Sequence, residues 1–407
     1  MKTKISNVGS VVTWSESSNK VINQDKIEIL VVDDRIVELS SKIDIEVDYE
    51  ISAQNAVLTP GFIDCHTHPV FFGNRSKEYV DRLGGKAYNL IAKEGGGILS
   101  TVEAVRGIDY STLYEASEQR INNFLKYGTT TIEAKSGYGL DLENEVKILN
   151  IIKDLNAASE LEILPTFLGA HSFPVEYKDN PIAYVDILCE EMLPYIAQRG
   201  LAIFCDVFCE EGYFSYEMSK RILSKAKELG LKNRLHADEF VDSRGSRLAA
   251  EVGCLSADHL MQSSDSGLKE MADKGVVATL LPGTTFFLGG NDFADFEKIK
   301  SYGIDVAMAT DYNPGTCTLQ SLPFIMNLGM MNYKMDIYEA FQSITVNAAK
   351  SLGMEKDIGV IEKGYQADLL FWNIELLEEI PYWVSENKII GIMKKGKLIK
   401  NLSLIEN

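Results

Sequence analysis

Histidine is scarce in this chain, with only five residues among 407, and several other features are missing altogether. No apolar run approaches the roughly 20 residues that span a bilayer, and the first ten residues, MKTKISNVGS, lack the apolar core of a secretion signal. We therefore expect a cytoplasmic protein with no membrane partner. Basic residues number 40 against 59 acidic ones, and the formal net charge of −19 argues against a nucleic-acid partner.

Cysteine is also sparse, and its six residues show no CxxC spacing. A chain of this length can bury a large core without covalent crosslinks. We expect the cysteines to be reduced, small and buried rather than paired in disulfides. They are Cys65, Cys189, Cys205, Cys209, Cys254 and Cys317.

The two ends of the chain have the same character: short strand-like runs separated by turns, with no good helix. In the first part, residues 26–32 and 35–39 flank Asp33 and Asp34 as the two arms of a hairpin would. Neither end is large enough to form a stable sheet domain alone. We predict one small β-sandwich, discontinuous in sequence, made from residues 1–58 and 354–407.

Between these ends, across residues 59–353, strand-like runs alternate with helix-like runs that glycines often follow. Most of the strand-like runs are continuously apolar, which is typical of strands buried on both faces of a parallel sheet. Eight strands in such alternation predict an α/β fold of the TIM-type (β/α)8 barrel class. The alternative is a doubly wound open sheet, but no GxGxxG follows a first strand. The eight predicted strands are 61–66, 129–135, 163–171, 202–209, 234–238, 255–259, 276–281 and 305–311.

Three helices are predicted at 184–199, 216–229 and 243–252 from apolar residues at three- and four-residue spacing. The glycines at 95–97 lie in a long insertion, where we expect a mobile loop.

The segment TPGFIDCHTHP, residues 59–69, places His66 and His68 at the end of the first predicted strand. Alternate side chains of a strand point to the same face, so these two imidazoles can reach one metal ion. The alternative is a pair of ordinary histidines in a turn. The positions of the other histidines separate the two readings.

Every other histidine also belongs to a predicted strand of the barrel. His171 ends the third strand, His236 sits in the fifth, His259 ends the sixth, and Asp311 ends the eighth. Active sites of such barrels lie at the carboxyl ends of the strands, so all these side chains should meet there. We predict one catalytic divalent metal with four ligands, zinc being favoured and iron next. The predicted ligands are His66, His68, His236 and Asp311.

This arrangement resembles the amidohydrolase superfamily: HxH on strand one, single histidines on strands five and six, and an aspartate on strand eight. Six blocks resemble the imidazolonepropionase family more specifically, and the resemblance covers essentially the whole chain. Ser172 and Cys317 stand at positions where the family pattern leads us to expect other small residues. No lysine is an obvious carboxylated bridge between two metals: Lys135 is the only candidate near a strand end, and it belongs to the KSGYG block. This supports one metal rather than two. The blocks are HTHPVFFGNR (66–75), KSGYGL (135–140), GAHSFP (169–174), HADE (236–239), ADH (257–259) and DYNPGT (311–316).

The resemblance implies hydrolysis of 4-imidazolone-5-propanoate to N-formimino-L-glutamate, a small-molecule substrate of histidine degradation. It implies that His259 and Glu239 are catalytic, with His259 at the attacking water and Glu239, which also contacts substrate, nearer the ring nitrogen. Arg75 would grip the propanoate carboxylate with its guanidinium fork. The other implied substrate-binding residues are Tyr138, His171, Asn313, Gly315 and Thr316.

Two other functions are compatible with the same barrel. One is hydrolysis of another cyclic amide or deamination of a nucleobase-like ring, but a deaminase would not need Arg75 together with Tyr138. The other is a non-catalytic scaffold without metal, which loss of ligands would mark, whereas all four ligand residues are present. The family resemblance also suggests a homodimer.

Overall fold

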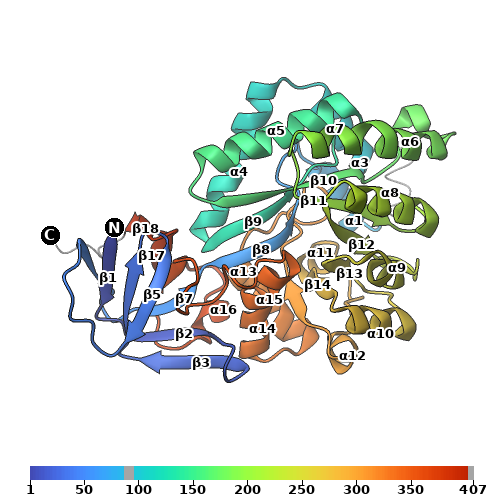
Figure 1. Cartoon of the computed structure of the whole chain (residues 1–407). Coiled ribbons are helices and arrows are strands. Elements are labelled where there is room, and N and C mark those ends of the chain that lie inside the picture. Colours follow the sequence, from blue (N-terminus) through green and yellow to red (C-terminus); the bar gives the residue numbers. More distant parts are fainter. Residues whose placement is uncertain (87–95, 402–407) are drawn as a thin grey trace.

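Eight parallel strands form the centre of the fold in the computed structural model, which describes residues 1–86 and 96–401 (Figure 1). Each strand pairs with the next in chain order, from β8 to β15. The predicted barrel is therefore confirmed, and the doubly wound alternative is wrong. The strands are β8 (Phe62–Thr67), β9 (Thr129–Lys135), β10 (Glu162–Ala170), β11 (Phe204–Cys209), β12 (Lys232–Ala237), β13 (Ser256–His259), β14 (Val277–Leu280) and β15 (Val306–Met308).

The barrel closes between the first strand and the segment that follows the last one. Asp311 N donates to His66 O over 3.1 Å, and His68 N donates to Tyr312 O over 2.8 Å. Asp311 lies three residues after Met308, so the predicted eighth strand is shorter than expected. Residues 309–311, predicted as the end of that strand, instead belong to the segment that pairs with the end of β8. This pairing closes the barrel and brings Asp311 beside His66 and His68.

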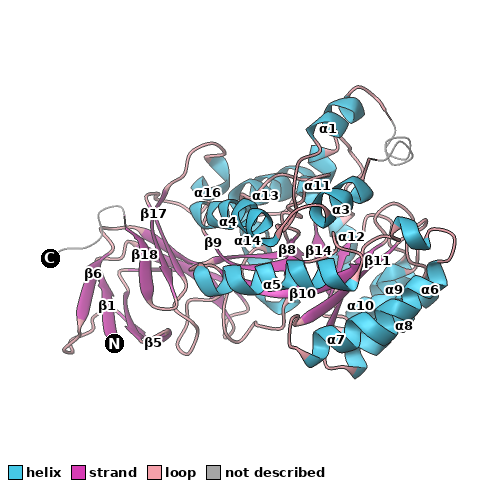
Figure 2. Cartoon of the chain, turned by 90° about the horizontal axis from the view of Figure 1, so that it is seen from above, coloured by secondary structure: helices cyan, strands magenta, loops and turns pink. Residues whose placement is uncertain are grey.

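Helices pack around the outside of this barrel (Figures 1 and 2). All three predicted helices are present, although the first contains a π-helical segment before Pro194, which has no N–H to donate. They are α1 (Ser76–Leu83), α3 (Ile98–Arg106), α4 (Tyr110–Lys126), α5 (Leu142–Ala158), η1 (Val175–Tyr177), α6 (Pro181–Ile187), η2 (Leu188–Met192), α7 (Leu193–Gln198), α8 (Tyr216–Glu228), α9 (Gly245–Val252), α10 (Asp265–Lys274), α11 (Pro282–Phe287), α12 (Phe296–Ser301), α13 (Leu322–Leu328), η3 (Gly329–Tyr333), α14 (Ile337–Ser343), α15 (Val346–Ser351) and α16 (Glu379–Tyr382).

The two ends of the chain form two sheets that lie together at one side of the barrel (Figure 1). β16 pairs with β7, so segments from both ends share one sheet. Apolar side chains from both sheets form a separate core that includes Ile5, Ile29 and Phe371. The sheets are β5-β4-β1-β6 and β18-β17-β16-β7-β2-β3. Their strands are β1 (Lys2–Ser6), β2 (Ser10–Ser15), β3 (Lys20–Asp25), β4 (Glu28–Val32), β5 (Arg35–Ser40), β6 (Tyr49–Ser52), β7 (Val57–Pro60), β16 (Leu369–Trp372), β17 (Ile389–Lys394) and β18 (Lys397–Asn401).

Several finer predictions can be compared with the described residues. The six cysteines are free and buried, as expected. Gly95 lies outside the described residues, while Gly97 is the N-cap of α3, so the mobile loop stays a prediction. The exact division into 1–58 with 354–407 and 59–353 remains our proposal, since β7 already reaches Pro60. Within 1–86 and 96–401, no helix is both long and apolar enough to cross a membrane.

Candidate metal centre and substrate cleft

Three of the four predicted ligands converge at the end of β8. His66 Nε2 and His68 Nε2 are 3.3 Å apart, and Asp311 Oδ1 lies 3.5 Å from the first and 3.4 Å from the second. All three side chains are buried. The strand alternation explains the pairing of the histidines, and the barrel closure explains the aspartate.

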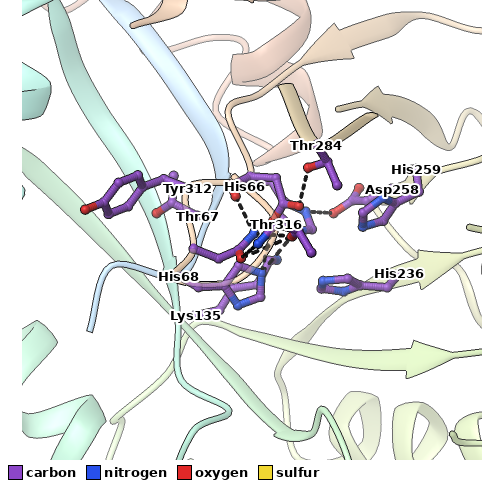
Figure 3. A network of polar contacts seen from close by, with 12 residues as sticks. His66, Thr67, His68, Lys135, His236, Asp258, His259, Thr284, Tyr312 and Thr316 are labelled. Carbon is purple, nitrogen blue, oxygen red and sulfur yellow. Dashed lines mark hydrogen bonds and ion pairs between the residues drawn. The ribbon is translucent and has the colours of Figure 1, made fainter. Parts of the chain in front are cut away.

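His236, on β12, approaches His66 from another strand of the barrel (Figure 3). Its ring centroid is 4.5 Å from that of His66 and 5.6 Å from that of His68. Two groups of side chains within 1–86 and 96–401 have ligand atoms within 4.8 Å of one another: His66 with His68 and Asp311, and His66 with His236 and His259. His259 therefore also lies within reach of a metal, although the sequence indicated an acid–base residue.

The donor atoms fit a cation. Asp258 Oδ2 lies 2.7 Å from His66 Nδ1, and a carboxylate only accepts, so Nδ1 carries the proton and Nε2 presents its lone pair. That lone pair lies near His68 Nε2 and Asp311 Oδ1, and all three side chains are buried. Burial, followed by neighbouring cationic groups, lowers the pKa of His66 and His68 well below the usual value. Neutral imidazole is the form that binds metal.

A second layer of charged side chains supports this cluster, and the sequence reasoning missed it. Arg234 Nη2 lies 3.2 Å from the same Asp258 oxygen that faces His66. Asp206 Oδ2 lies 3.1 Å from His236 Nδ1, in an arrangement that falls short of hydrogen-bond geometry. Asp311 Oδ2 accepts from Thr284 Oγ1 over 2.6 Å, a contact drawn in Figure 3. The signal available in the sequence was a lone charged residue within an apolar strand, such as Asp206 in FCDVFC.

Lys135 is part of this layer. Its Nζ lies 2.7 Å from Asp206 and 2.9 Å from Glu133, and all three side chains are fully buried. Burial opposes the charged form, but Asp206 and then Glu133 outweigh it, and the pKa of Lys135 is raised. Lys135 is thus held as an ammonium ion between two carboxylates, which does not suit a carboxylated bridge between metals.

Backbone strain is concentrated at the same strand ends. Asp238, His259, Leu260 and Asp311 have φ values of 52°, 79°, 58° and 51°. Residues other than glycine rarely adopt this left-handed conformation, and such strain clusters at functional sites. Here it turns the chain sharply after β12, β13 and β15, so that His259 and Asp311 face the barrel mouth.

A cleft opens above the cluster, and most of the predicted site residues line it. Gly315 is the exception among the predicted substrate contacts: it lies against Arg75, and a Cβ on it would come within 2.0 Å of Arg75 Nη1. Phe208 and Tyr213 also line the cleft, and the sequence reasoning did not find them. The predicted residues that line it are His68, Arg75, Tyr138, His171, His236, Glu239, His259, Asp311, Asn313 and Thr316.

Arg75 lies at this cleft and is only 7% exposed, which excludes an ordinary surface ion pair. Its Nε donates to Glu78 Oε2 over 2.8 Å. Glu78 also accepts from Gly97 N and Ser100 Oγ, so the pair connects α1 to the start of α3.

Glu239 and His259 face each other across the cleft floor, with 3.7 Å between Oε2 and Nε2. Burial, then Asp311 and Glu210, raises the pKa of Glu239 well above its usual value. Burial lowers the pKa of His259 to about 3. Glu210 accepts hydrogen bonds from the backbone N–H of Glu239 and Phe240 and thereby holds this loop.

The segment after Asp311 folds around the side chain of Asn313. Asn313 Oδ1 accepts from Gly315 N and Thr316 N over 2.8 and 2.7 Å, and its Nδ2 donates to Asp311 O over 2.7 Å. These bonds define the turn that carries Thr316 to the cleft and Gly315 to Arg75.

Comparison with known proteins identifies the family of this chain. The Amidohydrolase family profile matches residues 57–399. An imidazolonepropionase from Alkaliphilus oremlandii (strain OhILAs) is 44% identical over 378 residues, which cover 91% of this chain and 89% of that protein. The imidazolonepropionase from Clostridium tetani (strain Massachusetts / E88) is 41% identical over 408 residues and 97% of each chain.

Solved structures share the fold at much lower identity. An adenosine deaminase from Xanthomonas campestris with bound zinc superposes with a TM-score of 0.73 at 16% identity, over 100% of this chain and 94% of that one. Identity this low carries the fold alone, whereas the curated relatives match at more than 40% over most of both chains. The chain therefore belongs to the imidazolonepropionase family, a group of hydrolases within the amidohydrolase superfamily.

Proposed function

We propose that this chain hydrolyses 4-imidazolone-5-propanoate to N-formimino-L-glutamate, using one divalent metal held by His66, His68, His236 and Asp311. The observation that carries the proposal is the cleft itself. It has a convergent histidine and aspartate cluster at its floor and the guanidinium of Arg75 at its wall. Zinc and iron both accept nitrogen and oxygen ligands of this kind. When bound, such a metal polarises a carbonyl oxygen and lowers the pKa of a coordinated water.

Substrate recognition is assigned to the cleft walls. Arg75 binds the propanoate carboxylate, because a guanidinium fork matches a carboxylate in two parallel hydrogen bonds. Tyr138 and His171, whose ring centroids are 5.3 Å apart, hydrogen-bond the ring or tail. Asn313 and Thr316 line the cleft beside them, and Gly315 lies against Arg75. A deaminase of a nucleobase-like ring would not need the carboxylate anchor, so we favour the imidazolone.

The reaction adds water to the ring carbonyl carbon and breaks the bond from that carbon to the ring nitrogen. His259 orients the attacking water and accepts its proton, because its ring lies beside the predicted ligands and 3.7 Å from Glu239. Glu239 lies beside it and transfers a proton to the departing nitrogen, which a carboxyl group with a raised pKa is suited to do.

The direct test is an assay of purified, metal-loaded protein with freshly prepared 4-imidazolone-5-propanoate, following loss of the ring absorbance. We expect turnover that disappears after dialysis against a chelator and returns when zinc or ferrous iron is added back. Metal-loaded protein that does not open this ring would contradict the proposal. A homodimer in the cytoplasm also remains part of the proposal, and light scattering of the purified protein checks the dimer.

A further inference from the structure

Glu145 is a fully buried carboxylate near the start of α5 that has no part in the proposed hydrolysis. Its oxygens accept hydrogen bonds from three backbone N–H groups of one loop. Gly137 N lies 3.1 and 3.0 Å from the two oxygens, Gly139 N lies 2.7 Å from Oε1, and Leu140 N lies 2.9 Å from Oε1. A carboxylate of this kind is the acceptor that otherwise unpaired buried N–H groups require.

The loop has a shape that depends on this contact. Gly137 and Leu140 have φ values of 106° and 54°, so the chain turns twice through the left-handed region. A Cβ on Gly139 would lie 2.5 Å from the backbone N of Glu145, which shows how closely the loop packs on α5. With its N–H groups turned inward, the loop has no strand or helix ladder to pair them.

The same loop holds two side chains of the cleft, its own Tyr138 and His171, which follows β10 (Glu162–Ala170). Tyr138 lies within it and lines the cleft at 2% exposure. Gly137 O lies 3.0 Å from His171 Nδ1, and since a carbonyl only accepts, the imidazole donates. The ring of His171 then stacks on the ring of His68, with centroids 5.2 Å apart. Movement of this loop would therefore displace Tyr138 and His171 together.

We propose that Glu145 is a positioning residue for substrate binding: its carboxylate holds the Gly137–Leu140 loop so that Tyr138 and His171 meet the substrate in one fixed arrangement. This inference rests on the proposed function, because it takes both side chains as substrate contacts. Arg106 holds the loop from outside, where its Nε donates to Gly139 O over 2.7 Å.

The test compares Glu145→Gln with the wild-type enzyme. The substitution removes the charge and turns an amide N–H₂ toward a backbone donor. We expect KM for the imidazolone, and the inhibition constant of N-formimino-L-glutamate, to rise about 10-fold, since a lost charge-assisted contact is worth about that factor. The value of kcat should change less than about threefold, because the loss affects ground-state and transition-state binding alike. Amide exchange over residues 136–141 should accelerate.

Glu379→Gln is the matched control. Its carboxylate also accepts two backbone N–H groups, from Glu375 and Leu376, but in a turn outside the cleft lining. This variant should keep wild-type KM and kcat. If Glu145→Gln does not fold, Arg106→Gln replaces it, because that side chain is 24% exposed and acts on the same loop; it should show the same rise in KM.

The outcomes separate the two proposals. Wild-type enzyme that opens the ring, combined with unchanged KM and product inhibition in the folded Glu145 variant, would overturn the positioning role and leave the proposed function intact. If Glu145→Gln does not fold, a folded Arg106→Gln variant with unchanged KM and product inhibition would likewise overturn the positioning role. Metal-loaded wild-type enzyme that does not turn over would overturn the proposed function and, with it, this inference.

Discussion

His66 Nδ1 lies 2.7 Å from Asp258 Oδ2, and neither side chain is exposed to solvent. Arg234 lies 3.2 Å from the same carboxylate oxygen and donates to the backbone carbonyl of Cys65. The contact leaves His66 one orientation and one tautomer, with Nε2 directed at His68 and Asp311. Such outer contacts tune how firmly a histidine binds metal.

The first prediction is therefore that Asp258→Asn weakens metal binding by about 10- to 100-fold, as loss of an outer-shell carboxylate usually does. Chelator competition on the purified protein measures the affinity. The control is Asp368→Asn, which alters a buried carboxylate that pairs with Lys394 in the terminal sheet. An Asp258→Asn protein with wild-type metal affinity would show that the contact does not orient the ligand.

The second prediction concerns metal content. Elemental analysis of the wild-type protein should find about one metal per chain, as for a mononuclear catalytic site, and His236→Ala should lose most of it. His171→Ala is the control, because it removes a buried histidine of the same cleft from outside the proposed ligand set. A fully metallated and active His236→Ala protein would end this assignment.

The third prediction is that Arg75→Ala loses roughly 2–5 kcal/mol of substrate and product binding, because a partly desolvated charge pair is broken. Arg75→Lys should recover little, since a point charge cannot reproduce the guanidinium fork. Steady-state KM and product inhibition provide the measurement. Arg247→Ala serves as control: that arginine is exposed and pairs with Glu270 at 3.5 Å. Unchanged affinity in Arg75→Ala would place the carboxylate elsewhere.

The fourth prediction separates the two proton carriers. His259→Ala and Glu239→Ala should each lose about 10²- to 10⁴-fold in turnover, the usual size of positioned proton transfer, while elemental analysis still finds the metal. Because the two groups are 3.7 Å apart, the double variant should lose much less than the product of the single losses. A metallated His259→Ala enzyme with near-normal turnover would leave Glu239 as the sole base.

The fifth prediction concerns the contact between the barrel and the terminal sheet. Lys394 Nζ lies 2.7 Å from Asp368, 3.0 Å from Glu162 and 3.2 Å from Thr131 Oγ1. Lys394→Met should reduce the free energy of unfolding by about 3–5 kcal/mol, because buried carboxylates lose their counter-charge. Denaturant unfolding measures this change. Lys395→Met, at a 48% exposed lysine beside it, should change little, and equal losses in both variants would contradict the buried role of Lys394.

Much of the fold could be predicted from the sequence because its strands have a clear apolar and β-branched pattern. All eight predicted barrel strands are present, because continuous apolar and β-branched runs favour strands that are buried on both faces of a parallel sheet. Gly200, Gly230 and Gly253, which follow the three predicted helices, all have positive φ, as a helix end with a left-handed residue requires. These are local properties, and neighbouring residues in the chain determine them.

The candidate site was predictable only in part. The rule that strand ends meet at one barrel mouth brought His66, His68, His236, His259 and Asp311 together in advance. It did not reveal the carboxylates behind them, because Asp206 and Asp258 read as isolated charges in strands. Nor did it show that Gly315 lies behind Arg75 rather than in the cleft lining.

The sequence by itself determined which strand each histidine lies in or follows. It also determined that His66 and His68 point the same way at the end of β8, because the pleat of a strand alternates with every residue. Only the tertiary structure decided which side chains touch. Asp258 is 192 residues from His66 in the chain, and Thr310 is 246 from Asp64. Contacts of that kind arise when the barrel closes, since the register between distant strands sets the distance between their side chains.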